Sequence, residues 1–243
     1  MRDRGGSGDD RRPLAVIVAH GQPSDPGPAE AEIAALAGKV AVLVPELRLR
    51  SATLAMDGAL ARAVAGEAQV AVYPLFMADG WFTETHLPAR LAAAGAASVI
   101  RLRPFGLDPG VQALTVNLAR EAAEASGQRP EAVDLLLAAH GSFRSDAPAA
   151  VARAMARRIE DEAGFRKVRP AYIDQTPRIA EVATDLGPGA ICLPFFAARG
   201  GHVADDLPKA LTEGGFAGHL ADPVGVDPRV PGLIAVALRA ALT

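Results

Sequence analysis

Residues 73–88, YPLFMADGWFTETHLP, and residues 193–208, LPFFAARGGHVADDLP, are two versions of one segment, 120 positions apart. VAHGQ at 18–22 matches AAHGS at 138–142 at the same spacing, and PFGLDP at 104–109 matches PVGVDP at 223–228 at a spacing of 119. Three separate matches at nearly constant spacing indicate that a unit of about 120 residues is duplicated.

The sequence around these matches alternates between two hydrophobic patterns. Short continuous apolar runs, typical of parallel strands buried on both faces, cover Leu14–Ala19, Val70–Phe76, Leu135–Ala139 and Ile191–Phe196. Longer amphipathic stretches, typical of helices, cover Ala29–Val44, Met56–Val64, Thr85–Ala94, Val111–Ala125, Ala147–Ala163, Pro177–Leu186, Asp205–Leu211 and Pro231–Leu242. The alternation predicts an α/β protein of two lobes, each built on a doubly wound parallel sheet.

Changes in composition mark the expected lobe boundaries. The charged, glycine-bearing residues 1–13 are expected to form a disordered tail. The polar stretch SGQRPE at 126–131 indicates the join between the lobes. The sequence therefore predicts an N-terminal lobe over residues 14–127 and a C-terminal lobe over residues 128–243.

The composition excludes several classes of protein. Half of the 243 residues are hydrophobic, which suits a sizeable core, and a net charge of −3 lacks the basic field of a nucleic-acid binder. No apolar stretch approaches the ~18 residues of a membrane helix. The one cysteine, Cys192, excludes an internal disulfide and a cysteine-ligated metal site, and its apolar surroundings predict a buried thiol. We therefore expect a cytoplasmic enzyme or binding protein with no nucleic-acid or membrane partner.

Four of the five histidines lie in the duplicated motifs. His20 and His140 each follow a predicted strand and precede a glycine, and His86 and His202 lie in the later motif. Ligands of open α/β sheets bind at the carboxyl ends of the strands, where an imidazole can act as base, acid or metal ligand. An isolated histidine can equally cap a strand, and His219, outside the motifs, is expected to be structural.

The two halves differ where the chemistry is expected. Phe82 occupies the position of His202, and His86 occupies the position of Asp206. Two imidazoles and a carboxylate suit a divalent first-row metal. A structural site would have four protein ligands, commonly including cysteines, and that pattern is absent, so we expect an open site that leaves positions for other ligands. Glu84 is a candidate ligand from the first half, although a carboxylate in the first turn of a helix also suits the helix dipole.

These motifs resemble those of the class II tetrapyrrole chelatases, which include the sirohydrochlorin cobalt and iron chelatases and, more distantly, the ferrochelatases. The resemblance covers Leu14 to Thr243, and GGHVADDLP at 200–208 is its most specific segment. It implies two flavodoxin-like lobes with a tetrapyrrole cleft between them. It also implies that a divalent metal is inserted into a metal-free macrocycle without an organic cofactor. The partners are then the tetrapyrrole and the metal, and association into a homo-oligomer stays open.

The resemblance also implies a set of site residues. In many cobalt chelatases both catalytic histidines lie in the first half, but Phe82 replaces the second of them here. The arrangement looks like that of the ferrochelatases, with two histidines from the second half and a glutamate from the first. The implied catalytic residues are His140, His202 and His20, and the implied metal ligands are His140, His202, Glu84 and His86. The implied substrate-binding residues are Ser142, Arg144, Arg199, Gly200, Gly201, Trp81 and Phe82.

The predicted function is that of a sirohydrochlorin chelatase in cobalamin or siroheme biosynthesis. Cobalt is the first choice of metal, with iron and nickel as alternatives. A non-catalytic tetrapyrrole or metal carrier or sensor of the same fold is the alternative function, because Phe82 removes a first-half histidine. A nucleotide-binding protein is disfavoured, since no G-x-G-x-x-G or P-loop motif follows a strand.

Overall fold

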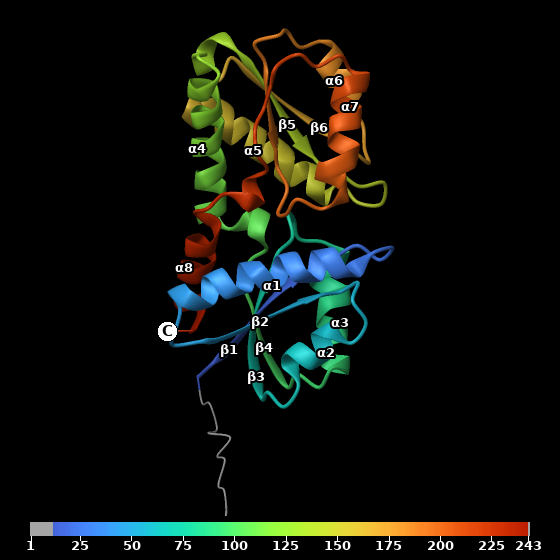
Figure 1. Ribbon diagram of the computed structural model, residues 1–243, viewed down its shortest axis with the longest axis vertical. Coiled ribbons are helices and arrows are strands. Elements are labelled where there is room, and N and C mark those ends of the chain that lie inside the picture. The colour runs from blue at the N-terminus through green and yellow to red at the C-terminus, as the bar shows by residue number, and fades with distance from the viewer. Residues whose placement is uncertain (1–11, 243) are drawn as a thin grey trace, which may run out of the picture.

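The computed structural model describes residues 12–242 and contains two parallel four-stranded sheets (Figure 1). The first sheet has the order β2-β1-β3-β4, and the second has the matching order β6-β5-β7-β8. The strands are β1 (Leu14–Ala19), β2 (Arg48–Thr53), β3 (Gln69–Pro74), β4 (Ser98–Arg101), β5 (Asp134–Ala139), β6 (Lys167–Tyr172), β7 (Ile191–Pro194) and β8 (His219–Leu220). All pairings are parallel and the two orders correspond, so the predicted α/β class with two duplicated lobes is confirmed.

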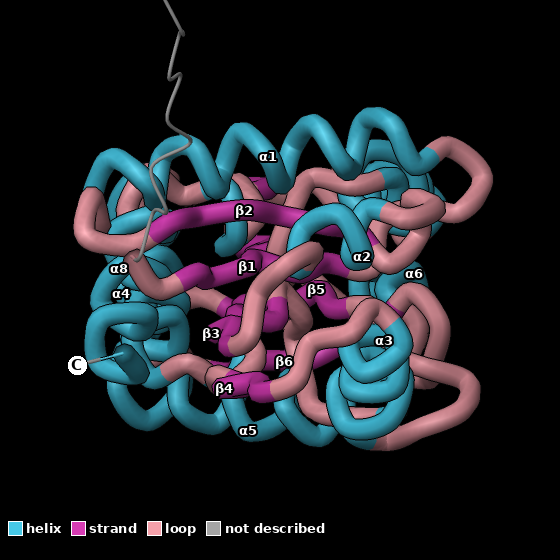
Figure 2. Tube along the Cα trace, turned by 90° about the horizontal axis from the view of Figure 1, so that it is seen from below, coloured by secondary structure: helices cyan, strands magenta, loops and turns pink. Residues whose placement is uncertain are grey.

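Helices flank both sheets, as the view along the long axis in Figure 2 shows. They are α1 (Pro26–Leu43), α2 (Ala59–Val64), α3 (Leu87–Ala93), α4 (Pro109–Ala125), α5 (Ala147–Ala163), α6 (Ile179–Thr184), α7 (Leu207–Glu213) and α8 (Val230–Leu242). Each overlaps a predicted amphipathic stretch, because its alanine- and leucine-rich face packs into the cores that cover the sheets.

The strands that hydrophobicity does not predict are β2, β4, β6 and β8, which are the edge strands of the two sheets in the order given above. The central strands β1 and β5 are buried over almost their whole length. By contrast, β2 reads RLRSAT and is half-buried over its first four residues, and β8 is exposed at both of its residues. An edge strand has solvent beside it and tolerates charged side chains, so it lacks the continuous apolar run of a central strand.

The last helix of each half packs against the sheet of the other half. Helix α4 contacts α5 and β7 of the second sheet, and α8 contacts α1 and β3 of the first sheet (Figure 1). In sequence, α4 belongs to the predicted lobe 14–127 and α8 to the predicted lobe 128–243. Each sheet therefore needs a helix from the other half to complete its cover, and this exchange ties the two lobes together.

An ion-pair cluster links the two exchanged helices. The Arg229 guanidinium, just before α8, lies 2.7 Å from Oε1 of Glu121 on α4 and 2.8 Å from Oδ1 of Asp227. Hydrogen bonds from Arg229 lower the pKa of both carboxyl groups. Carboxyl groups with a lowered folded-state pKa stabilise the fold above their unfolded pKa of about 4, and that contribution is lost as the pH falls through the folded-state value.

Arg229→Gln is therefore expected to lower the melting temperature at pH 7 by about 2 °C, since partly exposed ion pairs contribute about 1 kcal/mol or less. The difference from the unmodified protein should shrink as the pH is lowered below 4, because the carboxyl groups then become protonated in both proteins. Thermal unfolding followed by circular dichroism across this pH range measures the effect. A difference that does not depend on pH would mean that Arg229 acts by packing and not by charge.

Three further sequence expectations concern Cys192, membrane spans and the tail. Cys192 is fully buried in β7, as predicted, and burial raises the pKa of its thiol. Across residues 12–242, none of the helices combines the length and apolar character needed to cross a bilayer. Most of the predicted tail lies outside the described residues, but the Arg12 guanidinium is described and donates to the Pro45 carbonyl at 2.7 Å.

Candidate functional site

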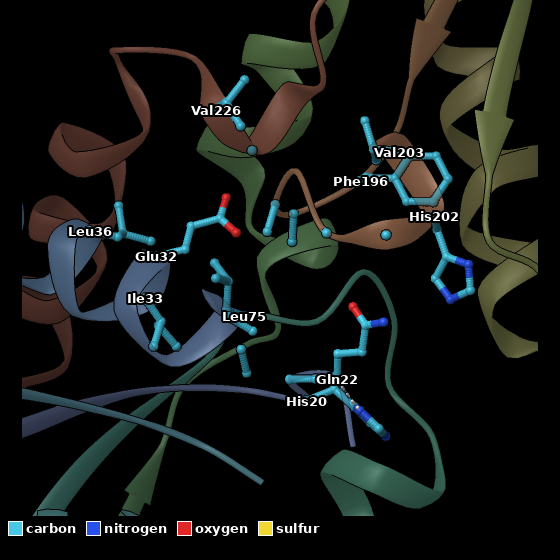
Figure 3. Close-up of a pocket in the computed structure, with 18 of the residues that line it drawn as sticks. His20, Gln22, Glu32, Ile33, Leu36, Leu75, Phe196, His202, Val203 and Val226 are labelled. Carbon is cyan, nitrogen blue, oxygen red and sulfur yellow. Dashed lines mark hydrogen bonds between the residues drawn. The ribbon is translucent and has the colours of Figure 1, made fainter. Parts of the chain in front are cut away.

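A cleft of about 1050 Å³ lies between the two halves, at the carboxyl ends of the central strands (Figure 3). The first half contributes the loop after β1, one side of α1 and residues after β3, and the second half contributes the loops after β5 and β7 and residues before α8. Apolar side chains such as Ile33, Leu36 and Leu75 share the walls with His20 and His202. The volume lies at the upper end of ligand pockets, which are about 300–1,000 Å³, so the cleft has room for a macrocycle.

Two histidines of the second half meet on the wall of this cleft. Nε2 of His140 lies 2.9 Å from Nε2 of His202, and the two rings are nearly perpendicular at 87° with centroids 4.3 Å apart. Their side chains are 41% and 48% exposed, so both nitrogens are within reach of a ligand in the cleft.

Hydrogen bonds on the far side of each ring fix where the protons lie. Nδ1 of His140 lies 2.9 Å from the Gly141 carbonyl, and Nδ1 of His202 lies 2.7 Å from Oδ2 of Asp206. Both partners only accept hydrogen bonds, so each Nδ1 carries a proton and each neutral ring has its lone pair on Nε2. Two lone pairs 2.9 Å apart repel each other unless a cation binds them. Two imidazole nitrogens each about 2.1 Å from one metal ion are about 3.0 Å apart at a ligand angle of about 90° and about 3.4 Å apart at a tetrahedral angle, so the spacing of the pair is close to that of two ligands of one metal.

The position of His202 depends on a π-helical turn at residues 202–206, directly before α7. This turn allows Asp206 to reach back to His202, and the carboxylate orients the ring. The first half has the equivalent turn at residues 82–86, before α3. π-Helical turns often occur at functional sites. The hydrophobic periodicity of the sequence predicts helices that begin at Thr85 and Asp205, and it gives no sign of these π-helical turns.

Asp174 is a neighbour of the histidine pair that sequence reasoning missed. Its Oδ2 lies 3.8 Å from Nδ1 of His140, and its backbone N–H donates to the His140 carbonyl at 2.8 Å. It follows strand β6, whose sequence KVRPAY carries no continuous apolar run. The signal that could have found it is an acidic residue after a possible third strand of the second half, at the edge where ligands bind.

The first half brings its motif residues together in a different way. Nδ1 of His20 lies 2.8 Å from the Gly21 carbonyl, and its ring stands 4.4 Å from the ring of Phe82. His86 stacks on Trp81 with ring centroids 4.7 Å apart. His20 and Phe82 line the cleft, whereas Trp81 and His86 lie outside its lining.

The first-half carboxylate that lines the cleft is Glu32 of α1 and not Glu84. Figure 3 shows the Glu32 side chain pointing into the cavity, where its Oε1 accepts a hydrogen bond from the backbone N–H of Arg199 at 3.1 Å. Among residues 12–242, no cluster of three or more His, Cys, Asp or Glu side chains is arranged to hold a metal. The two facing imidazoles of His140 and His202 are the candidate metal ligands on the cleft wall.

The predicted substrate-binding residues divide between several places. Gly200 and Gly201 line the cleft, whereas Ser142 and Arg144 line a smaller hollow of about 440 Å³ that also includes Asp174. The guanidinium of Arg199 donates to Asp222 at 2.7 Å and is already paired.

Comparisons with known proteins agree with the duplication. The family model CbiX matches residues 14–122 and again residues 134–241, while a search of curated proteins finds no match. A solved structure of CbiX, described as the terminal enzyme for biosynthesis of siroheme in denitrifying bacteria, is 49% identical to this chain with a TM-score of 0.87. The match covers 95% of this chain and 100% of that chain.

Two structures of SirB share the fold at lower identity. SirB from Bacillus subtilis with Fe³⁺ is 15% identical with a TM-score of 0.76, and covers 95% of each chain. The sirohydrochlorin chelatase SirB from Bacillus subtilis subspecies spizizenii in complex with cobalt is 16% identical with a TM-score of 0.69, again over 95% of each chain. The family model covers both sheets and the loops that carry His20, His140 and His202. Because the model matches nearly the whole chain, the chain belongs to the CbiX family.

Proposed function

We propose that this chain is a sirohydrochlorin chelatase, which inserts a divalent metal ion into metal-free sirohydrochlorin bound between the lobes. The observation that carries the proposal is the pair of facing Nε2 atoms of His140 and His202 on the wall of a cleft of macrocycle size. The relatives support the choice of substrate, since SirB is named a sirohydrochlorin chelatase and CbiX an enzyme of siroheme biosynthesis.

Cobalt is our first choice of metal and iron the second. SirB structures hold Fe³⁺ in one case and cobalt in the other, and the CbiX relative is described as an enzyme of siroheme biosynthesis. Imidazole ligands accept both metals, with affinities that rise from Fe²⁺ through Co²⁺ to Ni²⁺ for a given set of ligands. Metal availability, and not the identity of these ligands, then decides which ion is inserted.

The two imidazoles act as a temporary holding site for the metal. His140 and His202 each donate one Nε2 lone pair, and their Nδ1 hydrogen bonds keep both rings in the metal-binding tautomer. The ion retains water at its other positions, and pyrrole nitrogens replace that water when the ion enters the ring. Two protein ligands hold the ion less firmly than four macrocycle nitrogens do, so transfer to the macrocycle is favoured.

Anaerobic incubation of the protein with sirohydrochlorin and Co²⁺ tests this function. We expect the absorption spectrum of the macrocycle to change to that of the metallated form faster than in the reaction without protein. The same measurement with Fe²⁺ and Ni²⁺ ranks the metals. Acceleration with none of the three metals would contradict the proposal.

A carrier or sensor is the second candidate function, and Phe82 is the observation in its favour, because it leaves the first half with one imidazole in the cleft. Such a protein would bind sirohydrochlorin, seen as a shift of its absorption bands, without accelerating metal insertion. The incubation above separates the two functions because it records binding and insertion in one experiment.

A further inference from the structure

Lys39 is the one lysine or arginine among the described residues that line the cleft. It lies on α1, two turns and so about 10 Å along the helix axis beyond Glu32. Figure 3 shows Leu36, one turn before Lys39, on the side of the cavity away from His202. The ammonium group therefore belongs to the part of the cleft that lies away from the histidine pair.

Lys39 has no ionic partner within residues 12–242, where its ammonium group makes neither a hydrogen bond nor an ion pair. Ion pairs along a helix join residues three or four positions apart. At those positions from Lys39 the chain has apolar residues, which are Ala35, Leu36, Val42 and Leu43. The methylene groups of Lys39 can lie on these neighbours while its charge stays in the cleft. The helix thus presents an uncompensated positive charge to a ligand.

The carboxylates that line the same cleft are mostly bonded within the protein. Glu32 accepts a hydrogen bond from a backbone N–H across the cleft, Asp206 accepts one from its histidine partner, and Asp227 pairs with an arginine. The fourth, Asp205, makes no ion pair within the described part of the chain. Four carboxylates and one ammonium group make the wall negative except around Lys39, so an anionic ligand is attracted there and repelled elsewhere.

The proposed substrate is such an anion. Sirohydrochlorin carries carboxylate side chains around the rim of its macrocycle, and the centre of the ring has to reach the ion at the histidine pair. The rim then extends away from that pair into the rest of the cleft, which follows α1 to Lys39. Two arginines expected to bind these carboxylates do not serve this part of the cleft, because Arg199 is paired with Asp222 and Arg144 lines the separate hollow.

We propose that Lys39 binds a carboxylate on the rim of the tetrapyrrole and thereby fixes how the macrocycle is turned in the cleft; this role rests on the proposed chelatase function. Leu36 and Val226 give this part of the cleft apolar walls (Figure 3), and low polarity strengthens the attraction between opposite charges. Since Lys39 lies away from the histidine pair, it contributes to binding of the macrocycle and not to binding of the metal. Lys39 therefore determines specificity for acidic tetrapyrroles.

Replacing Lys39 by methionine removes the charge and keeps an unbranched side chain. Lys39→Met is expected to raise the Kd for sirohydrochlorin, measured without metal, about 10-fold. Quenching of Trp81 fluorescence by the bound macrocycle measures this Kd, because Trp81 is the one tryptophan of the chain and its ring lies 5.0 Å from that of Phe82 on the cleft wall. Lys39→Arg keeps the charge and should bind like the unmodified protein, whereas Lys39→Glu should bind more weakly than Lys39→Met.

Three further readouts separate an ion pair from a structural effect. Added salt should weaken binding by the unmodified protein more than binding by Lys39→Met, because salt screens charges. The Co²⁺ affinity of Lys39→Met without macrocycle, measured by calorimetry, should equal that of the unmodified protein. In metal insertion, its KM for sirohydrochlorin should rise about as much as the Kd, with a smaller change in kcat, as for a residue that contributes mainly to substrate binding.

Lys167→Met is the matched control, since it changes the net charge by the same amount. Lys167 is the first residue of β6 and lies at the amino ends of the strands, opposite the cleft. This variant should leave the Kd for sirohydrochlorin unchanged.

Two results would overturn the role of Lys39. One is a Lys39→Met protein with the Kd of the unmodified protein, and the other is an equal loss of affinity in Lys167→Met, which would mean that net charge alone governs binding. Failure of the chelatase function itself looks different. The unmodified protein would then bind sirohydrochlorin in a manner that depends on Lys39, but it would insert no metal.

Discussion

His202→Ala is expected to weaken Co²⁺ binding by more than about 100-fold and to abolish metal insertion, while the protein stays folded. Loss of the partner that orients a ligating histidine costs about 10–100-fold in metal affinity, and loss of the ligand itself costs more. The His202 side chain is 48% exposed, so its removal opens no cavity in the core. It also relieves the contact between two lone pairs in the metal-free protein.

Thermal unfolding with and without Co²⁺ measures this prediction directly. A ligand that binds only the folded state stabilises it by RT ln(1 + L/Kd), where L is the ligand concentration, so the melting temperature rises with the ratio of L to Kd. The unmodified protein should therefore be stabilised by Co²⁺, and His202→Ala should not be. Without metal, the two proteins should melt at about the same temperature, which separates loss of the site from loss of the fold.

Neighbouring carboxylates provide graded controls. Asp206→Ala should weaken Co²⁺ binding by about 10–100-fold, because His202 loses the acceptor on its Nδ1. Asp205→Ala removes a carboxylate from the same turn that makes no hydrogen bond to either histidine, and it should have little effect. If both variants weaken binding equally, the negative charge of the turn matters and the orientation of His202 does not.

The sequence predicts the meeting of His140 and His202 for a physical reason. Both follow central strands, β5 and β7, whose continuous apolar runs are easily recognised. Because these strands are parallel neighbours, their carboxyl ends and the loops after them come together. The duplication strengthens the inference, since each motif is seen twice.

The remaining parts of the site depend on information that hydrophobic patterns do not carry. Asp174 follows β6, which Arg169 and Pro170 prevent from resembling a buried strand. Whether Glu32 or Glu84 faces the cleft depends on how α1 and the first π-helical turn are rotated against the sheet. The sequence also does not show which sheet α4 and α8 cover, because both helices have an apolar face that would suit either sheet.

Gly225→Ala is expected to destabilise the protein by about 3 kcal/mol and to lower the melting temperature by about 6–12 °C. A Cβ on Gly225 would lie 2.0 Å from the carbonyl oxygen of Ala197 and 2.1 Å from its carbonyl carbon. The Gly225 N–H donates to the Phe196 carbonyl at 2.8 Å, so a backbone hydrogen bond joins the two loops at this contact. No flexible side chain can move aside, and one of the two loops must shift.

The contact occurs in both halves, which supplies a matched comparison. A Cβ on Gly106 would lie 2.1 Å from the Met77 carbonyl oxygen, so Gly106→Ala should lower the melting temperature by a similar amount. Gly225 lines the cleft and Gly106 does not, so the folded Gly225→Ala protein alone should also lose Co²⁺ affinity and insertion rate. Gly232→Ala, within α8 where an added Cβ meets no atom within 4 Å, should stabilise slightly through helix propensity. A Gly225→Ala protein that melts like Gly232→Ala would show that the loops separate at little cost, and that this contact does not fix the shape of the cleft.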